Sequence, residues 1–177
     1  MKADALAIRD AAPGDLDRLA ALGTATYREH FAALWTEAGL ESFLERDFST
    51  RALSTTLERR DAHLWLLACD ADGVEVGFAK LNWARPVPGS AEPGAELQKI
   101  YLRKSAAGQG YGSVLVEHAI RRARERGEPR LWLEVLKSNQ AAQDFYSRSG
   151  FAIVGEQPYH TDKYHIGLLV MVRSLDL

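Results

Sequence analysis

Apolar positions follow a helical spacing up to about residue 60. After it, short apolar runs typical of strands alternate with stretches of helical spacing. Over residues 15–34, apolar side chains recur every three or four positions, which is the spacing of a helix with one buried face. The same spacing predicts two further helices, one over residues 36–46 and one from Ser49 or Thr50 to about residue 60. The first third of the chain is therefore predicted to be mostly helical, after a short strand at residues 5–9.

From residue 63 the pattern changes to short apolar runs rich in β-forming residues. Residues 63–69 and 74–83 are two such runs, and Asp70-Ala-Asp-Gly73 between them predicts a hairpin turn. A loop with three prolines over residues 85–94 leads to another strand at 95–102. These runs predict neighbouring strands of one sheet.

The last part of the chain alternates helices and strands. Helices are predicted over 113–126, which Gly127 ends, and from Ser138 or Asn139 to Ser149, which Gly150 ends. The strands between and after them are expected at 130–136, 151–155 and 164–173. Because no repeat or linker interrupts the series, we expect residues 1–177 to form a single α/β domain.

A glycine-rich loop lies between the strand that ends at Leu102 and the helix that follows. Its sequence is Gly108-Gln-Gly-Tyr-Gly112. Free backbone N–H groups at a helix start attract anions, and glycines allow a diphosphate to approach the backbone. The loop lacks the Lys-Ser or Lys-Thr of a P-loop, and its G-x-G-x-G spacing late in the chain differs from the dinucleotide-binding fingerprint. The loop therefore predicts a diphosphate ligand of another kind.

Composition narrows the class of protein. The 177 residues are 46% hydrophobic and 26% charged, which is globular, and the single cysteine, Cys69, excludes an internal disulfide framework. We find neither an apolar run long enough to span a bilayer nor a signal peptide at the start, so we expect a cytoplasmic protein without a membrane partner. The net charge of −2 argues against nucleic acid, while residues 1–98, with a net charge of −6, suit a cationic partner.

The complete series of motifs is more specific than the loop. The strand, Gly108–Ser113, the helix, the strand at 131–136 and the segment Asn139-x-x-Ala-x-x-Phe-Tyr146-x-x-x-Gly-Phe151 resemble the GCN5-related N-acetyltransferase (GNAT) superfamily. This resemblance implies an α/β (α+β) fold: a central mixed, mostly antiparallel sheet of about seven strands, flanked by helices, with a V-shaped splay between the two central strands. It also implies acetyl-CoA as cosubstrate and no metal.

The resemblance assigns roles to particular residues. The pyrophosphate of CoA would lie on the loop, and the pantetheine arm beside the strand before it and the segment after the next strand. The residues so implied are Ile100, Tyr101, Leu102, Gly108, Gln109, Gly110, Tyr111, Gly112, Ser113, Asn139 and Tyr146. One position departs from the family pattern, since Ala107 stands where the loop usually begins with Arg or Gln.

Acetyl transfer to an amine needs a base for the amine and an acid for the departing thiolate. Tyr146 matches the family's tyrosine near the CoA sulfur and is our candidate acid, although a packing role suits its helix as well. For the base, Glu96 opens the strand beside the thioester, and Glu134 on a neighbouring strand is the second candidate. Asn139 also suits a plain helix cap. The five histidines show no convincing metal spacing.

We therefore expect acetyl transfer to a primary amine of a small cationic molecule. Glu96-Leu-Gln-Lys-Ile-Tyr-Leu102 and the stretch from Tyr27 to Phe48 resemble bacterial spermidine/spermine acetyltransferases, which favours a polyamine. Two alternatives remain: acetylation of a protein N-terminus or lysine, and a non-catalytic acyl-CoA-binding regulatory module. The sequence also leaves open whether the chain forms a homodimer.

Overall fold

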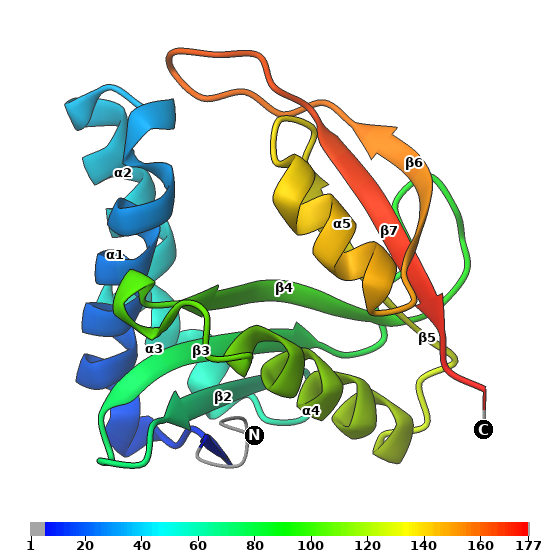
Figure 1. Ribbon diagram of the computed structural model, residues 1–177, viewed down its shortest axis with the longest axis horizontal. Helices are drawn as coiled ribbons and strands as arrows, with labels where there is room; N and C mark the ends of the chain where they lie inside the picture. The colour runs from blue at the N-terminus through cyan, green and yellow to red at the C-terminus, as the bar shows by residue number, and fades with distance from the viewer. Residues whose placement is uncertain (1–5, 177) are drawn as a thin grey trace.

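The computed structural model describes residues 6–176, and one sheet of seven strands lies at its centre (Figure 1). The strand order is β1-β2-β3-β4-β5-β7-β6. All neighbours are antiparallel except β4 and β5, which run parallel. The strands are β1 (Ala7–Asp10), β2 (His63–Cys69), β3 (Glu75–Asn82), β4 (Ala95–Leu102), β5 (Arg130–Leu136), β6 (Ala152–Gln157) and β7 (Leu168–Ser174). The predicted mixed, mostly antiparallel sheet is confirmed.

Five α-helices in the described residues cover this sheet: α1 (Leu16–Phe31), α2 (Glu37–Phe48), α3 (Thr50–Glu58), α4 (Tyr111–Glu125) and α5 (Gln140–Arg148). Helices α1–α3 gather on one side of the molecule (Figure 1), where their apolar faces pack against Trp65, Leu67 and Phe78 of the sheet. Helices α4 and α5 pack on the other apolar cluster, which includes Leu133. The sheet is thus covered on both faces.

Helix α4 is held firmly against the sheet. Its Leu115, Val116 and Ile120 side chains are fully buried, and burying each one stabilises the fold by about 1.5–3 kcal/mol. These residues follow one another at the helical spacing that the sequence shows. The position of the N-terminus of α4 is therefore set by the core rather than by a flexible loop.

The two central strands diverge. β4 and β5 pair only at Ala95 with Leu131 and at Glu96 with Trp132. Beyond Glu96 the edge of β4 that faces β5 has no strand partner, and the two strands form the two arms of a V. The V-shaped splay implied by the resemblance is present, and Glu96 lies at its apex.

Several predicted boundaries differ from the observed ones. The first strand begins at Ala7, while residue 5 of the prediction lies outside the described residues. The helix predicted over 15–34 ends at Phe31 and continues as a 3-10 turn, Ala32–Leu34. The strand predicted over 164–173 is Leu168–Ser174, because the residues before it form a loop with an isolated bridge between His160 and His165.

The start of the helix after the glycine loop was predicted two residues too late. α4 begins at Tyr111, not at Ser113, so Gly112 and Ser113 lie in its first turn. The glycines hide this start in the sequence, since they lower helix propensity. Within residues 6–176 we find no helix with the length and apolar character needed to cross a membrane.

Candidate active site

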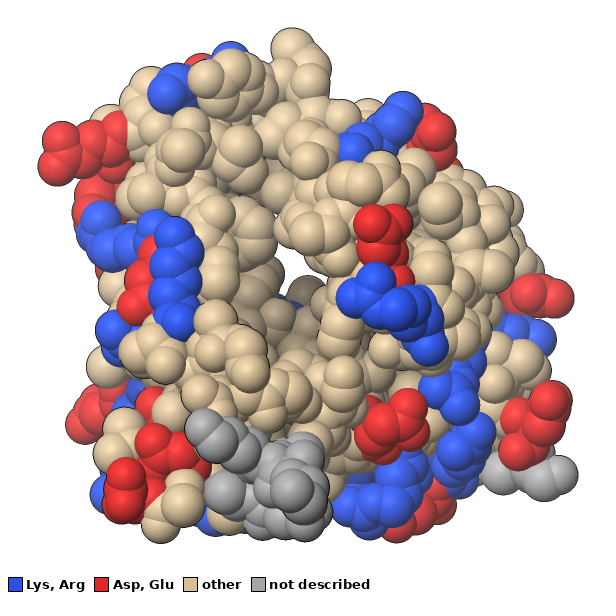
Figure 2. All heavy atoms as spheres, in the orientation of Figure 1, with Lys and Arg blue, Asp and Glu red and all other residues tan. Residues whose placement is uncertain are grey.

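A cavity of about 600 Å³ opens between the arms of the V. It is lined by β4 and β5 from Glu96 and Leu133 onward, by α1 and α2 on one side and by α5 on the other. Figure 2 shows a hollow in the middle of this face of the molecule, between the side formed by α1 and α2 and the side formed by α5. The candidate acid Tyr146 and both candidate bases, Glu96 and Glu134, line this hollow, whereas residues 108–113 of the glycine loop do not.

Two carboxylates face this cavity near the apex of the V. The Nδ2 atom of Asn82 donates a hydrogen bond of 2.8 Å to Oε2 of Glu96. Glu134 follows two residues after Trp132, the strand partner of Glu96, and its side chain is reached by solvent inside the cavity. Partial burial, and then the negative charge of Glu96, raise the pKa of the Glu134 carboxyl. Within the described residues neither carboxylate forms an ion pair.

Tyr146 reaches the cavity from α5, on the opposite wall. Its ring makes edge contacts with Phe145 and Phe151, whose ring centres lie 5.2 and 5.9 Å away. Burial raises the pKa of the Tyr146 phenol. The hydroxyl therefore keeps its proton at neutral pH and can donate it or a hydrogen bond within the cavity.

The glycine loop forms a cradle of open backbone. Gly108 and Gly110 have φ values of +74° and +78°, and a Cβ atom added to either would meet no heavy atom within 4 Å. Gly110 is the N-cap of α4, no side chain caps the helix, and its first turn holds no acidic residue. The N–H groups of the first turn have no partner within the helix. This arrangement of free donors, open space and absent negative charge fits a diphosphate.

The wall of the cavity opposite α5 holds an ion pair. Lys99 on β4 is 9% exposed, and its Nζ lies 3.0 Å from Oδ2 of Asp47 in the last turn of α2. Burial works to raise the pKa of Asp47, but Lys99 and then Arg46 outweigh it and hold the pKa below its ordinary value. Behind this pair, burial and then the charge of Lys99 lower the pKa of the Lys80 ammonium to about 8.

The loop between β6 and β7 closes the far end of the cavity. Its Tyr159 lines the cavity together with Tyr27 of α1. Its Asp162 accepts hydrogen bonds from the backbone N–H of Thr36, at 3.0 Å, and from the Thr36 hydroxyl. In Figure 1 this loop arches across the top of the molecule toward α2. The size of the space for a ligand thus depends on a contact between two distant segments.

A sequence model of the acetyltransferase (GNAT) family matches residues 24–151, which is most of the chain. The chain belongs to this family. The match runs from α1 to the end of α5 and so includes both arms of the V and the glycine loop. The resemblance read from the motifs is confirmed at the level of the superfamily.

Individual relatives agree with this membership. An uncharacterized N-acetyltransferase of Mycobacterium tuberculosis is 30% identical over 91% of this chain and 98% of its own length. The L-methionine sulfoximine/L-methionine sulfone acetyltransferase of Pseudomonas aeruginosa is 29% identical, with coverages of 96% and 94%. The crystal structure of the PaiA N-acetyltransferase from Thermoplasma acidophilum in complex with coenzyme A has a TM-score of 0.77, 23% identity and coverages of 96% and 98%. This last similarity shows the fold.

The structure distributes the family-derived site residues over the cavity and its mouth. Asn139 lines the cavity and also caps α5, since its Oδ1 accepts the N–H of Ala142 at 3.1 Å. The carbonyl oxygen of Leu102 already accepts a hydrogen bond of 2.7 Å from Nε2 of His30. Tyr111 is buried against Val76, so that only its backbone faces the loop. The other predicted residues lie as follows: Ile100, Tyr101 and Ala107 line the cavity, while Gly108, Gln109, Gly110, Gly112 and Ser113 form the loop and the helix start.

Four residues of this site escaped the sequence reasoning: Asn82, Lys99, Asp47 and Tyr159. Asn82 ends an apolar strand, where a polar residue is typical of a loop. Lys99 stands next to Gln98 between Leu97 and Ile100, and this break in the alternation of apolar and polar residues was the one signal in the sequence that could have marked it. Asp47 and Tyr159 carry no local signal, because only the packing of α2 and of the β6–β7 loop brings them to the cavity.

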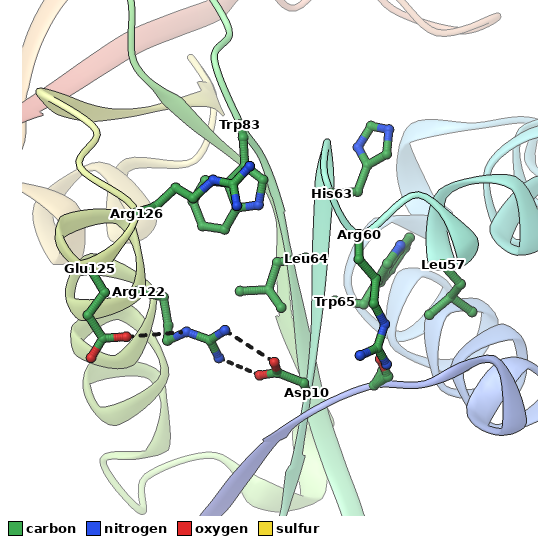
Figure 3. A pocket seen from close by; sticks show the side chains of 11 residues that line it. Asp10, Leu57, Arg60, His63, Leu64, Trp65, Trp83, Arg122, Glu125 and Arg126 are labelled. Atoms are coloured by element: carbon green, nitrogen blue, oxygen red, sulfur yellow. Dashed lines mark hydrogen bonds and ion pairs between the residues drawn. The ribbon is translucent and has the colours of Figure 1, made fainter.

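A second cavity, of about 240 Å³, lies between the ends of α3 and α4 (Figure 3). Its arginines are engaged within the protein: Arg122 pairs with Asp10 and Glu125, and the Arg126 guanidinium donates to the carbonyl of Asp61 and lies over Trp83. His63 also lines it. Across residues 6–176 no group of three or more His, Cys, Asp or Glu side chains could hold a metal ion.

Proposed function

We propose that the chain is an acetyl-CoA-dependent N-acetyltransferase that acetylates a primary amine of a small molecule, and that residues 1–177 form one catalytic domain. The observation that carries this proposal is the position of Glu96 and Tyr146 on two walls of one cavity, with the glycine loop at the start of α4 beside it. Family membership supports the same reaction class.

The chain offers a distinct surface to each part of the cosubstrate, which supplies an acetyl group activated as a thioester. The N–H groups of Gly108–Ser113 would hold the pyrophosphate. The edge of β4 from Ile100 to Leu102, which has no strand partner, would hydrogen-bond the pantetheine arm like an added strand, with Asn139 on the other side. Ala107 removes a side-chain contact from the loop, so the backbone carries the binding there.

Two side chains move protons in this proposal. A primary alkyl amine is protonated at neutral pH, and Glu96 takes its proton, directly or through water, so that the nitrogen lone pair can form the new C–N bond. Tyr146 donates a proton or a hydrogen bond to the sulfur as the C–S bond breaks. Glu134 is the alternative base, since its raised pKa brings it closer to neutral pH.

The charges around the cavity support two classes of acceptor. Glu96 and Glu134 attract an ammonium group, as a polyamine would provide, and this is the acceptor that the sequence favours. Lys99, on the same strand as Glu96, favours an amine that also carries an anionic or strongly polar group, as a zwitterionic amino acid does. The similarity to an acetyltransferase of L-methionine sulfoximine and L-methionine sulfone supports this second candidate.

A thiol-release screen tests the proposal and separates the candidates. The purified protein is incubated with acetyl-CoA and, in turn, with spermidine, spermine, L-methionine sulfoximine, L-methionine sulfone and a short peptide. Amine-dependent release of thiol supports an N-acetyltransferase, and the best acceptor identifies its class; activity on the peptide alone would favour a protein acetyltransferase. CoA binding without release of thiol from acetyl-CoA, whichever acceptor is added, would point to a regulatory module instead.

The Glu96→Gln variant tests the base. Glutamine keeps the size and the contact with Asn82 but cannot take a proton, so we expect kcat to fall by roughly 100-fold or more. CoA affinity, measured by calorimetry, should stay unchanged because Glu96 does not reach the glycine loop. An unchanged kcat, with Glu134→Gln inactive, would move the base to Glu134.

We also propose a homodimer, supported by β6. This strand lies at the edge of the sheet, and its Ile153 and Val154 are 54% and 58% exposed. Exposed apolar side chains on an edge strand favour association with another chain. Sedimentation equilibrium of the wild type and of Val154→Lys checks this: the proposal requires a dimer that the lysine weakens.

A further inference from the structure

Three polar side chains lie side by side across three neighbouring strands and end at the apex of the V. His63, Asn82 and Glu96 are direct cross-strand partners: His63 pairs with Asn82, and Asn82 pairs with Glu96. Nδ1 of His63 lies 2.7 Å from Oδ1 of Asn82, and Nδ2 of Asn82 donates to Oε2 of Glu96 at 2.8 Å. We call these three residues the polar row.

We propose that Asn82 and His63 are positioning residues that hold Glu96 as an ionised carboxylate aimed into the cavity. This inference rests on the proposed role of Glu96 as the base. It adds two residues, neither of which lines the main cavity, to those on which the proton transfer depends.

The donors and acceptors of the row allow one arrangement when Glu96 is ionised. A carboxylate only accepts hydrogen bonds, so the NH₂ group of Asn82 must face Glu96 and the amide oxygen must face His63. His63 must then donate from Nδ1, which selects the neutral tautomer with its proton on that nitrogen. Protonation of Glu96 at its free oxygen would turn the charge-assisted hydrogen bond from Asn82 to Oε2 into a weaker neutral one. The row therefore favours the ionised form.

Burial makes this arrangement matter. Asn82 is 1% exposed, and both ends of its amide are used within the row, so neither end can turn to water without a cost. Oε2 of Glu96 is held by Asn82, while the other carboxylate oxygen has no hydrogen-bond partner among the described residues. That free oxygen is the one available to an acceptor amine.

The charged groups around the row act in opposite directions. The charge of Glu96 raises the pKa of Glu134 on β5, after burial, whereas on Lys80 of β3 it opposes the lowering of the pKa by burial and by Lys99. Lys99 on β4 is paired with Asp47 of α2. Burial lowers the pKa of His63, Asn82 opposes this, and the charges of Lys80, Arg59 and Arg85 lower it further. His63 is therefore neutral at neutral pH, which makes its tautomer decisive.

His63 places the far end of the row away from the main cavity. In Figure 3 its imidazole, at the start of β2, points away from the ion pair of Arg122 and Asp10. A substitution at His63 therefore does not touch either substrate. Any effect on the catalytic pH profile must pass through Asn82.

The test compares the acid limb of the kcat/KM pH profile in matched variants. Asn82→Leu removes the donor to Glu96 while keeping the side-chain size, and should move the acid limb up by about one pH unit, with the KM for acetyl-CoA unchanged. His63→Phe should move it in the same direction by less. His63→Gln, which can still donate to Asn82, should restore the wild-type profile. Glu128→Gln, at a buried carboxylate that binds the Ala84 N–H instead, is the control and should leave the profile unchanged.

Two measurements on the resting enzyme are independent of activity. Nitrogen NMR should find the His63 proton on Nδ1, and carboxyl NMR should find a higher Glu96 pKa in Asn82→Leu and in His63→Phe than in the wild type. If the proton of His63 is on Nε2, or if the Glu96 pKa is unchanged in the folded variants, the proposed role of the polar row is wrong. If Glu96→Gln retains full activity, the proposed base fails instead, and the NMR results still decide the row.

Discussion

Gly110→Ala is the variant that isolates the cradle at the start of α4. Gly110 has φ +78°, where an L-residue other than glycine is strained by about 1–2 kcal/mol. The added Cβ would meet no protein atom within 4 Å, so the free protein suffers this strain and nothing more. For a chain of this size about 1 kcal/mol lowers Tm by about 2–4 °C. We therefore expect Tm to fall by roughly 2–8 °C.

The effect on CoA binding should be larger. The methyl group would occupy the open space in which the pyrophosphate approaches the backbone, and a hydrogen bond to a charged group contributes about 1.5–3 kcal/mol. Losing one such bond weakens binding by roughly 10- to 100-fold. Isothermal titration of CoA into the folded variant, well below its Tm, measures this directly.

Gly127→Ala is the matched control for this experiment. Gly127 follows the other end of α4, has φ +81°, and also has open space around its Cβ position. Its substitution should lower Tm by a similar amount and leave CoA affinity unchanged. Wild-type CoA affinity in Gly110→Ala would refute the assignment of the glycine loop to the pyrophosphate, whereas a comparable loss in both variants would show that strain in α4, not contact, weakens binding.

Three further variants test other parts of the structure. Tyr146→Phe should lower kcat by roughly 100-fold, the lower range for a lost acid, with little change in the KM for acetyl-CoA; steady-state kinetics that give the wild-type kcat would remove Tyr146 as the acid. Asp15→Asn should destabilise the protein by about 2 kcal/mol at pH 7, because Arg9 holds the pKa of Asp15 at about 2 in the fold. This depressed pKa stabilises the fold above about pH 4, and the gain is lost toward pH 2, where the urea unfolding curves of variant and wild type should converge. A pH-independent difference would contradict the ion pair. Gly39→Ala places a Cβ against the carboxylate of Asp162 and so displaces the β6–β7 loop. The KM for the acceptor should rise while that for acetyl-CoA stays, and equal changes in both would argue against a loop that closes the acceptor end alone.

The helices and strands could be predicted because their apolar residues repeat at the spacing of the element. The hydrophobic face of α4 alone located it to within two residues, and Gly127 marked its end. The cofactor half of the candidate site was predictable for a related reason. Its parts are contiguous in sequence: the loop, the helix start and the segment from Asn139 to Tyr146 each carry their own motif.

The acceptor half was not predictable, because its residues are brought together by pairing between distant segments. Asn82 meets Glu96 across 14 residues of sequence, and Lys99 meets Asp47 across 52. Neither contact has a local signature, since it depends on the register of the sheet and on the angle at which α2 crosses it. The acceptor is therefore the part of the function on which the sequence alone remained least specific.

A β-bulge in β4 explains why this half carries both signs of charge. Lys80 pairs with Lys99, yet Leu81 pairs with Leu97, so Gln98 is an extra residue on β4. In a regular strand Leu97 and Lys99 would face the same side. The bulge instead turns Lys99 to the face of α2, where it meets Asp47, while Ile100 packs with the core under α4. In the sequence the bulge is visible as two polar residues, instead of one, between the apolar residues Leu97 and Ile100. Because Glu96 precedes the extra residue and Lys99 follows it, one bulge puts the proposed base and a cation on the same face of one strand. An acceptor held between them would need an amine near Glu96 and an anionic or polar group near Lys99.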